Sequence, residues 1–182
     1  MKTSAILVFW SLLFFAAACP LLAQAQKKAD SQESCRKFVQ TFYDWYVPKA
    51  VHAHAGRSSD SALKYKRSAF SSELTRSLTE DSNAQKKADE IVGLDFDPFL
   101  GGQDTCEPYS LKKVTITGSK CQVEVFGSSC EKQAKADVVP ELELTGGRWL
   151  FVNFSYPNLG EHTDLLSTLK QLRNDRLAGK AK

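Results

Sequence analysis

Two carboxylates near the middle of the chain have a spacing that can do chemistry. Asp95 and Asp97 stand at positions i and i+2 after an apolar run, residues 91–94. Such a pair at the end of a buried strand holds Mg²⁺ and a phosphoryl group in enzymes with an aspartate nucleophile. Those enzymes continue with a long α/β scaffold, whereas antiparallel hairpins follow here, and Pro98 and Phe99 stand where a calcium loop needs oxygen ligands. We therefore interpret Asp95 and Asp97 as a structural motif that caps nearby amides.

The histidines and serines give a weaker catalytic signal. His52 and His54 would share a metal if both lay on one strand, but the sequence offers no third ligand nearby, so solvated loop histidines are favoured. His162 and the many serines lack a Gly-x-Ser-x-Gly elbow or a comparable signature. We therefore expect no catalytic residue, no metal and no cofactor, and a hydrolase is the third of three functional hypotheses.

Four aromatic side chains are the candidate ligand-binding residues: Tyr43, Trp45, Tyr46 and Trp149. A cavity between helix and sheet, bounded by Trp45 and Trp149, would suit a small apolar ligand, with a tyrosine hydroxyl to orient it. Packing of this aromatic helix face in the core is the favoured alternative.

The cysteines indicate an oxidising compartment. Of five cysteines, Cys19 lies in the N-terminal leader, which leaves an even number in the rest of the chain: Cys35, Cys106, Cys121 and Cys130. Because there is no CxxC pair, two disulfides are favoured over a zinc site. Three pairings are possible; we favour Cys121 with Cys130, a local closure around one strand and its turn, which leaves Cys35 to join Cys106.

The leader itself predicts export. Lys2 precedes an apolar stretch, residues 5–22, and Ala23-Gln24-Ala25 supplies the small residues that a signal peptidase recognises, so residues 1–25 are predicted to be a signal peptide. An uncleaved membrane anchor and a lipoprotein attached through Cys19 are the two alternatives. Contact with a membrane is expected only if Cys19 is lipidated or the leader stays uncleaved.

Helical periodicity marks three segments after the leader. Residues 26–34 are polar and read as a flexible lead-in, and the aromatic stripe that follows predicts a helix over residues 35–47 that Pro48 ends. Residues 49–66 read as a loop or a helix of low stability. A second helix is expected around Leu74, and a C-terminal helix with Thr163 as its cap and Gly179 as its stop.

Between the last two helices the period changes from helical to two-fold, which predicts four strands in two hairpins. A turn at residues 118–119 places Ile116 opposite Cys121, and one at residues 146–147 places Leu142 opposite Phe151. In the second hairpin Glu141 is expected opposite Val152. Pro140 predicts an edge or a bulge. Residues 35–179 thus form one α+β domain, in which a curved four-stranded antiparallel sheet carries N-terminal helices and a C-terminal helix.

Three segments resemble a known family: residues 42–46, residues 93–99, and residues 148–154 followed by Leu165-Leu166. They resemble the domain of unknown function 3828 family, small exported or lipid-anchored bacterial proteins, over about residues 36–176. The resemblance implies an NTF2-like, cystatin-like cone fold and a place in the periplasm or envelope of a bacterium. It brings no catalytic residues to transfer, and the four cysteines depart from the family pattern.

Composition and net charge indicate which classes of partner the chain can bind. Apolar residues make up 42% and charged residues 25% of the 182 residues, as in folded domains, and a net charge of +3 is too small to indicate a nucleic-acid partner. The leading hypothesis is a non-enzymatic domain that binds another envelope or secreted protein, as an immunity protein, an inhibitor or an assembly factor does. The alternative is a small-molecule-binding protein that uses the aromatic cavity.

Overall fold

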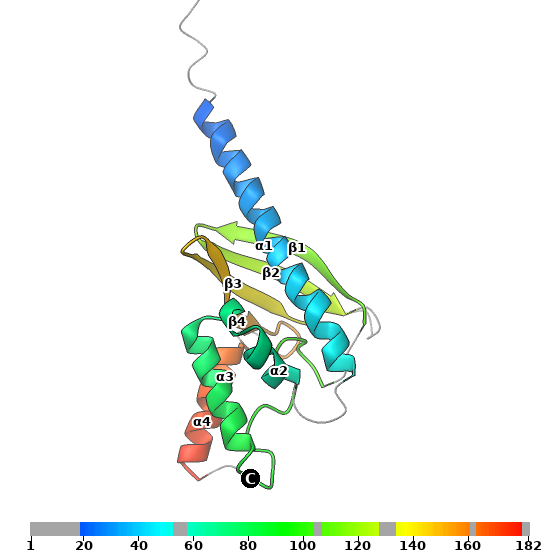
Figure 1. The fold of residues 1–182 in the computed structure, drawn as a ribbon, viewed down its shortest axis with the longest axis vertical. Helices are drawn as coiled ribbons and strands as arrows, with labels where there is room; N and C mark the ends of the chain where they lie inside the picture. Colours follow the sequence, from blue (N-terminus) through cyan, green and yellow to red (C-terminus); the bar gives the residue numbers. More distant parts are fainter. Residues whose placement is uncertain (1–18, 53–57, 104–106, 128–133, 161–162, 180–182) are drawn as a thin grey trace, which may run out of the picture.

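The computed structural model describes residues 19–52, 58–103, 107–127, 134–160 and 163–179 (Figure 1). In chain order these form α1 (Cys19–Val51), α2 (Ser58–Tyr65), the short 3-10 helix η1 (Arg67–Ala69), α3 (Ser72–Gln85), β1 (Tyr109–Thr117), β2 (Lys120–Gly127), β3 (Val139–Thr145), β4 (Arg148–Ser155) and α4 (Leu165–Leu177). The four strands make one antiparallel, open and curved sheet in the order β1-β2-β3-β4. The predicted α+β class and its arrangement of helices and sheet are therefore confirmed.

Both predicted hairpins form, with the expected partners near their turns. Ile116 pairs with Cys121 across the first turn, and Leu142 pairs with Phe151 across the second. Glu141 pairs with Asn153 and not with the predicted Val152, because β4 carries one extra residue beside Pro140. That break in register is the bulge predicted from the proline, which has no N–H to donate to the ladder.

Helix α1 is longer than the sequence predicted at both ends. It begins at Cys19, so the expected flexible lead-in, residues 26–34, is helical. This segment contains neither glycine nor proline, and the Gln26 amide donates to Asp30 one turn later at 2.9 Å. At the other end the helix passes Pro48 and gains a further turn, in which the His52 N–H donates to the Pro48 carbonyl at 3.3 Å.

A disulfide joins α1 to the sheet, and it corrects the predicted pairing. Cys35 is bonded to Cys121, with 6.7 Å between the Cα atoms. The pairing of Cys121 with Cys130, and therefore of Cys35 with Cys106, was wrong. From Cys121 to Gly127 strand β2 is extended over about 20 Å, a distance that three further residues cannot bring back. Cys121 instead lies on the sheet face that α1 covers, beside the buried Val123.

Cys106 and Cys130 lie outside the described residues, and their pairing is our first prediction. Tyr109 and Gly127 face each other at the end of the β1–β2 ladder; Cys106 precedes the first by three residues and Cys130 follows the second by three. With Cys35 and Cys121 joined, an even cysteine count predicts that these two join each other. Peptide mapping without reductant is expected to recover a peptide linked through Cys106 and Cys130. Two free thiols in the unfolded, unreduced protein would contradict this prediction.

Aromatic rings form the centre of the core between α1 and the sheet. Phe42 of α1 lies 4.9 Å, centroid to centroid, from Phe151 of β4 and 5.5 Å from Phe99. Phe99 in turn lies 5.1 Å from Phe154. The helical stripe predicted from the sequence is thus the buried face of α1, and it packs against the inward face of β4.

Both edges of the sheet are engaged by other parts of the chain. On the β1 edge, Gln32 and Arg36 of α1 donate to backbone carbonyls of Val114 and Leu111 at 3.0 and 3.2 Å. On the β4 edge, the Ser71 N–H donates to the Phe151 carbonyl at 2.8 Å. An added strand from another protein would have to displace these groups, which directs attention to the surfaces of the helices and turns.

The C-terminal helix packs beside α3 and the β4 edge (Figure 1). Asp164, not the predicted Thr163, is its N-cap, and its side chain accepts from the Ser167 N–H. Asp164 also accepts from the Asn153 amide at 2.9 Å, so the cap is tied to β4. Helix α4 ends just before Gly179, which has a positive φ of 66°, as expected of the glycine predicted to stop the helix.

Candidate ligand-binding groove

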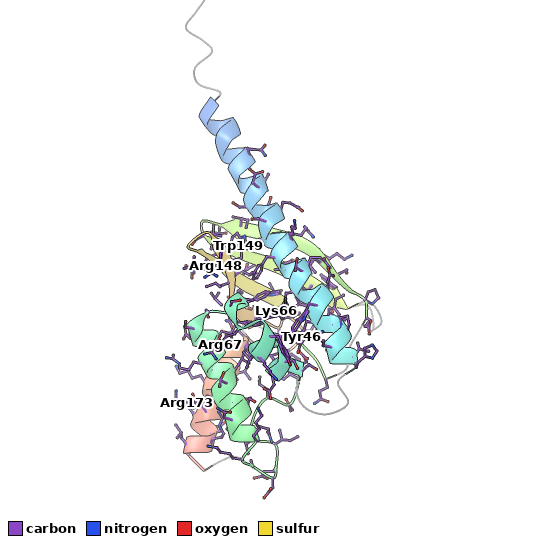
Figure 2. The ribbon with its side chains drawn as sticks, in the orientation of Figure 1. Tyr46, Lys66, Arg67, Arg148, Trp149 and Arg173 are labelled. Atoms are coloured by element: carbon purple, nitrogen blue, oxygen red, sulfur yellow. A yellow bond between two sulfur atoms is a disulfide. The ribbon has the colours of Figure 1, made fainter. Side chains whose placement is uncertain are left out.

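An open groove lies between α1, η1 and the turn that joins β3 to β4. Its volume is about 540 Å³ and it is lined by Ser34, Lys37, Phe38, Thr41, Phe42, Lys66, Ser68, Ala69, Gly147, Arg148 and Trp149. Figure 2 shows Arg148 and Trp149 at the start of β4 and Lys66 on the segment just before η1. Three elements that are distant in sequence therefore supply the walls.

The floor of the groove is aromatic and is fixed by the core. Phe38 is half-buried, and its ring lies 5.2 Å from that of the fully buried Phe151. Trp149 is also buried, and its indole N–H donates to the Ser34 hydroxyl at 3.1 Å. These contacts hold both rings in one orientation, so a ligand would meet a preformed apolar surface.

The rim of the groove is cationic. Lys37 and Arg148 are exposed, and Lys66 is half-buried with its ammonium 5.2 Å from the centre of the Trp45 ring. No carboxylate is among the lining residues. Within the described part of the chain, none of these three cations forms an ion pair; the ion pairs found there are made by Lys86, Arg173 and Arg176.

The structure does not bring the four predicted ligand-binding side chains together. Trp149 lines the groove, but Tyr43, Trp45 and Tyr46 do not. The Tyr43 hydroxyl donates to the Phe99 carbonyl at 2.7 Å, and the Tyr46 hydroxyl donates to Asp97 at 2.6 Å. Burial raises the pKa of both tyrosines well above the ordinary value. These two residues act in the core, and the groove that Trp149 lines does not include Trp45 among its described lining residues.

Asp97 organises the loop that those tyrosines hold. One of its carboxylate oxygens accepts from the N–H groups of Phe99 and Leu100, and the other accepts from Tyr46. Asp95 is exposed. Amide capping is therefore what Asp97 does, while Asp95 makes no hydrogen bond among those described for this loop. The pair presents only one carboxylate to solvent.

One of the three histidines lies in the described part of the chain. His52 is exposed at the end of α1, whereas His54 and His162 lie outside the described residues. Over the described ranges no group of three potential metal ligands occurs, and no described helix is long and apolar enough to cross a membrane.

Sequence reasoning missed most of the groove. Ser34, Lys37 and Thr41 follow one another at spacings of three and four, which places them on one helix face beside the aromatic stripe. The aromatic stripe, through Phe38 and Phe42, is the other signal for the groove in the sequence of α1. Lys66 and Arg148 come from segments whose approach to α1 depends on the tertiary fold.

Comparison of the chain with protein-family models, with curated proteins and with solved structures finds no match. The resemblance to the domain of unknown function 3828 family therefore stays a prediction, and the functional argument rests on the groove itself.

Our second prediction is that Asp97 makes the free energy of unfolding depend on pH. Burial raises the pKa of Asp97 from its ordinary value of 3.8, although hydrogen bonds from Tyr46, Phe99 and Leu100 oppose the shift. The folded state thus binds this proton more tightly than the unfolded chain. The stability that this protonation contributes is full below pH 3.8 and is lost as the pH rises through the raised pKa. The unfolding free energy of wild type minus that of Asp97→Asn should therefore increase as the pH falls from about 7 to about 4.

Asp164 is the matched control because its sign is opposite. Partial burial opposes its ionisation, but hydrogen bonds from Ser167, Asn153 and Leu166 outweigh that effect and lower its pKa. The stability that ionised Asp164 contributes is present above the ordinary pKa and is lost as the pH falls through the lowered pKa. The unfolding free energy of wild type minus that of Asp164→Asn should therefore decrease in acid. Urea unfolding at several pH values measures both differences. Parallel trends for the two variants would contradict the assignment for Asp97.

Proposed function

We propose that this chain is an exported, non-enzymatic binding domain of a bacterial envelope that recognises another envelope or secreted protein through the groove. The observation that carries the proposal is a preformed aromatic floor, the half-buried Phe38 beside the buried Trp149, next to three cations with no carboxylate among the lining residues. Aromatic side chains held in preformed pockets are typical of the central contacts of protein interfaces. An immunity protein, an inhibitor or an assembly factor would use such a surface.

Export is supported by two features. The leader has the composition of a signal peptide, and the Cys35–Cys121 disulfide is the kind of bond that persists in oxidising compartments. Within the exported proteins, we propose a location in the periplasm or the cell envelope.

Two tyrosines and one aspartate that were candidates for ligand binding or catalysis have structural hydrogen bonds instead. The polar side-chain atoms of these three residues are all hydrogen-bonded within the fold. Tyr46 donates to Asp97, Tyr43 donates to the Phe99 carbonyl, and Asp97 accepts from the backbone N–H groups of residues 99 and 100. Tyr156 does the same, because its hydroxyl donates to the Pro98 carbonyl at 2.8 Å. This network supports a structural role for Asp97.

Site-specific photocrosslinking in the native envelope tests the proposal. A photoreactive residue at Ser68, exposed on the groove wall, should give one discrete adduct, and Gln122 is the control position because it is exposed on the sheet face away from α1. The adduct protein, once purified, should bind the wild type with one-to-one stoichiometry in calorimetry and bind Ser68→Trp, whose side chain fills the groove, at least about tenfold more weakly. Equal adducts at both positions, or unchanged affinity of Ser68→Trp, would refute the groove as the interface.

A small-molecule ligand is the second candidate, and the size of the groove favours it. Ligand pockets commonly measure about 300–1,000 Å³, and this groove, at about 540 Å³, lies within that range. Native mass spectrometry distinguishes the two candidates. A bound mass that Ser68→Trp removes supports a small ligand, and an unliganded protein that still forms the Ser68 adduct supports a protein partner.

A further inference from the structure

The groove differs from the neighbouring hollow in its charge balance. The hollow between α3 and α4, about 320 Å³, contains four cations, but Glu73 and Glu80 also line it. There Arg173 pairs with Glu80 at 3.0 Å, and Arg176 pairs with the buried Asp81 at 3.0 Å. In the groove the three cations have no carboxylate between them. Among the described residues, none of the three groove cations is paired with a carboxylate.

The three cations that line the groove come from three separate elements of the fold. Lys37 comes from α1, Lys66 from the segment between α2 and η1, and Arg148 from the first position of β4. Phe38 and Trp149 form the floor that these cations flank.

We propose, on the basis of the proposed function, that the groove binds an acidic segment of the partner protein, with carboxylates on the rim and an apolar side chain on the floor. Charge complementarity assigns this occupant, since long basic side chains on a rim attract carboxylates while the desolvated floor supplies the apolar contact. Lys37 and Arg148 are the exposed rim groups, and their contribution is largely long-range attraction. At both sheet edges, backbone groups are already hydrogen-bonded to other parts of the chain, so strand addition there would have to displace these contacts.

Three labelled peptides of one length test the inference by fluorescence anisotropy. One alternates Glu with Leu and Phe, the second has Gln in place of every Glu, and the third has Lys in place of every Glu. We expect the acidic peptide to bind, the Gln peptide to bind about tenfold more weakly or worse, and the Lys peptide not to bind. Affinity for the acidic peptide should fall as salt rises from about 50 to 300 mM.

Charge-reversal variants locate the binding. Lys37→Glu and Arg148→Glu should each weaken binding of the acidic peptide by about tenfold, whereas Lys113→Glu, the same charge change on the exposed part of β1, should change it less than about twofold. Circular dichroism confirms that each variant is folded. Equal weakening by all three variants would show attraction to net charge alone and would overturn the inference, as would equal binding of the Gln and Glu peptides.

The failure of this inference and that of the proposed function have different signatures. If the Ser68 adduct forms and its purified protein binds, but neither the acidic peptide nor charge reversal has an effect, the acidic occupant is wrong and the protein-binding groove stands. If the Ser68 adduct is also absent, both the acidic occupant and the protein-binding groove are refuted.

Discussion

Replacing Asp81 with alanine is expected to lower the free energy of unfolding by about 3–5 kcal/mol, because it leaves a buried guanidinium without its counter-charge. Asp81 lies on α3 and is 1% exposed. One of its oxygens accepts from Arg176 of α4 at 3.0 Å, and the other accepts from the Leu94 N–H at 3.1 Å. Arg176 also donates to the Val92 carbonyl at 2.9 Å. A single carboxylate thus joins two helices and the loop between residues 91 and 94.

The neighbouring pair of Glu80 and Arg173 is the matched control. Its atoms are also 3.0 Å apart and it also joins α3 to α4, but its side chains are 43% and 58% exposed, against 2% and 15% for Asp81 and Arg176. Glu80→Ala should therefore cost no more than about 1 kcal/mol. The double variant Asp81→Ala with Arg176→Met should recover part of the loss, since it removes the unpaired charge. Urea unfolding measures all three, and equal losses for Asp81→Ala and Glu80→Ala would contradict the prediction.

Local patterns in the sequence predicted the sheet because hairpin register depends on a few neighbouring residues. Two-fold alternation beside the glycine turns was sufficient to pair Ile116 with Cys121 and Leu142 with Phe151. Where one extra residue entered β4, the same alternation mispaired Glu141. Pro140 indicated that a bulge was near, but a missing N–H does not say which strand carries the additional residue.

Helix boundaries were harder because capping and proline signals compete with tertiary contacts. Pro48 was expected to end α1, yet it lies within the last turns of the helix, where Val47 and Tyr46 are buried against the core. Residues 26–34 look like a solvated lead-in by composition. In the structure Gln32 reaches the β1 edge, a contact between groups 82 residues apart that no local pattern contains.

The candidate site depended almost entirely on long-range packing. The aromatic stripe of α1 was correctly recognised as a stripe, but its periodicity does not say which rings reach the core and which face an opening. The structure buries Tyr43 and Tyr46 and leaves Phe38 half-exposed in the groove. Likewise, Asp81 and Arg176 look like ordinary charged residues of helix surfaces, because they are 95 positions apart in sequence and no local pattern indicates their pairing.

The second large effect concerns the disulfide. Removing the Cys35–Cys121 bond with the double variant Cys35→Ala and Cys121→Ala is expected to cost about 4 kcal/mol of unfolding free energy. The bond closes a loop between residues 86 apart in sequence, so it removes many conformations from the unfolded chain. Alanine is chosen because both sites are at most 1% exposed and a serine hydroxyl would need a buried partner.

The same bond should also matter for the groove, through one residue. Ser34 directly precedes Cys35 and accepts the Trp149 indole N–H, so the disulfide fixes α1 where it orients the groove floor. With Trp10 and Trp45 replaced by phenylalanine so that Trp149 alone emits, reduction should therefore shift the fluorescence toward that of a more solvated indole at denaturant concentrations where the fold persists. Ser34→Ala, which removes the acceptor but keeps the disulfide, should reproduce the fluorescence shift while costing at most about 1–2 kcal/mol. If the double variant unfolds at the same urea concentration as oxidised wild type, the cross-link contributes nothing, and α1 is held by its aromatic face alone.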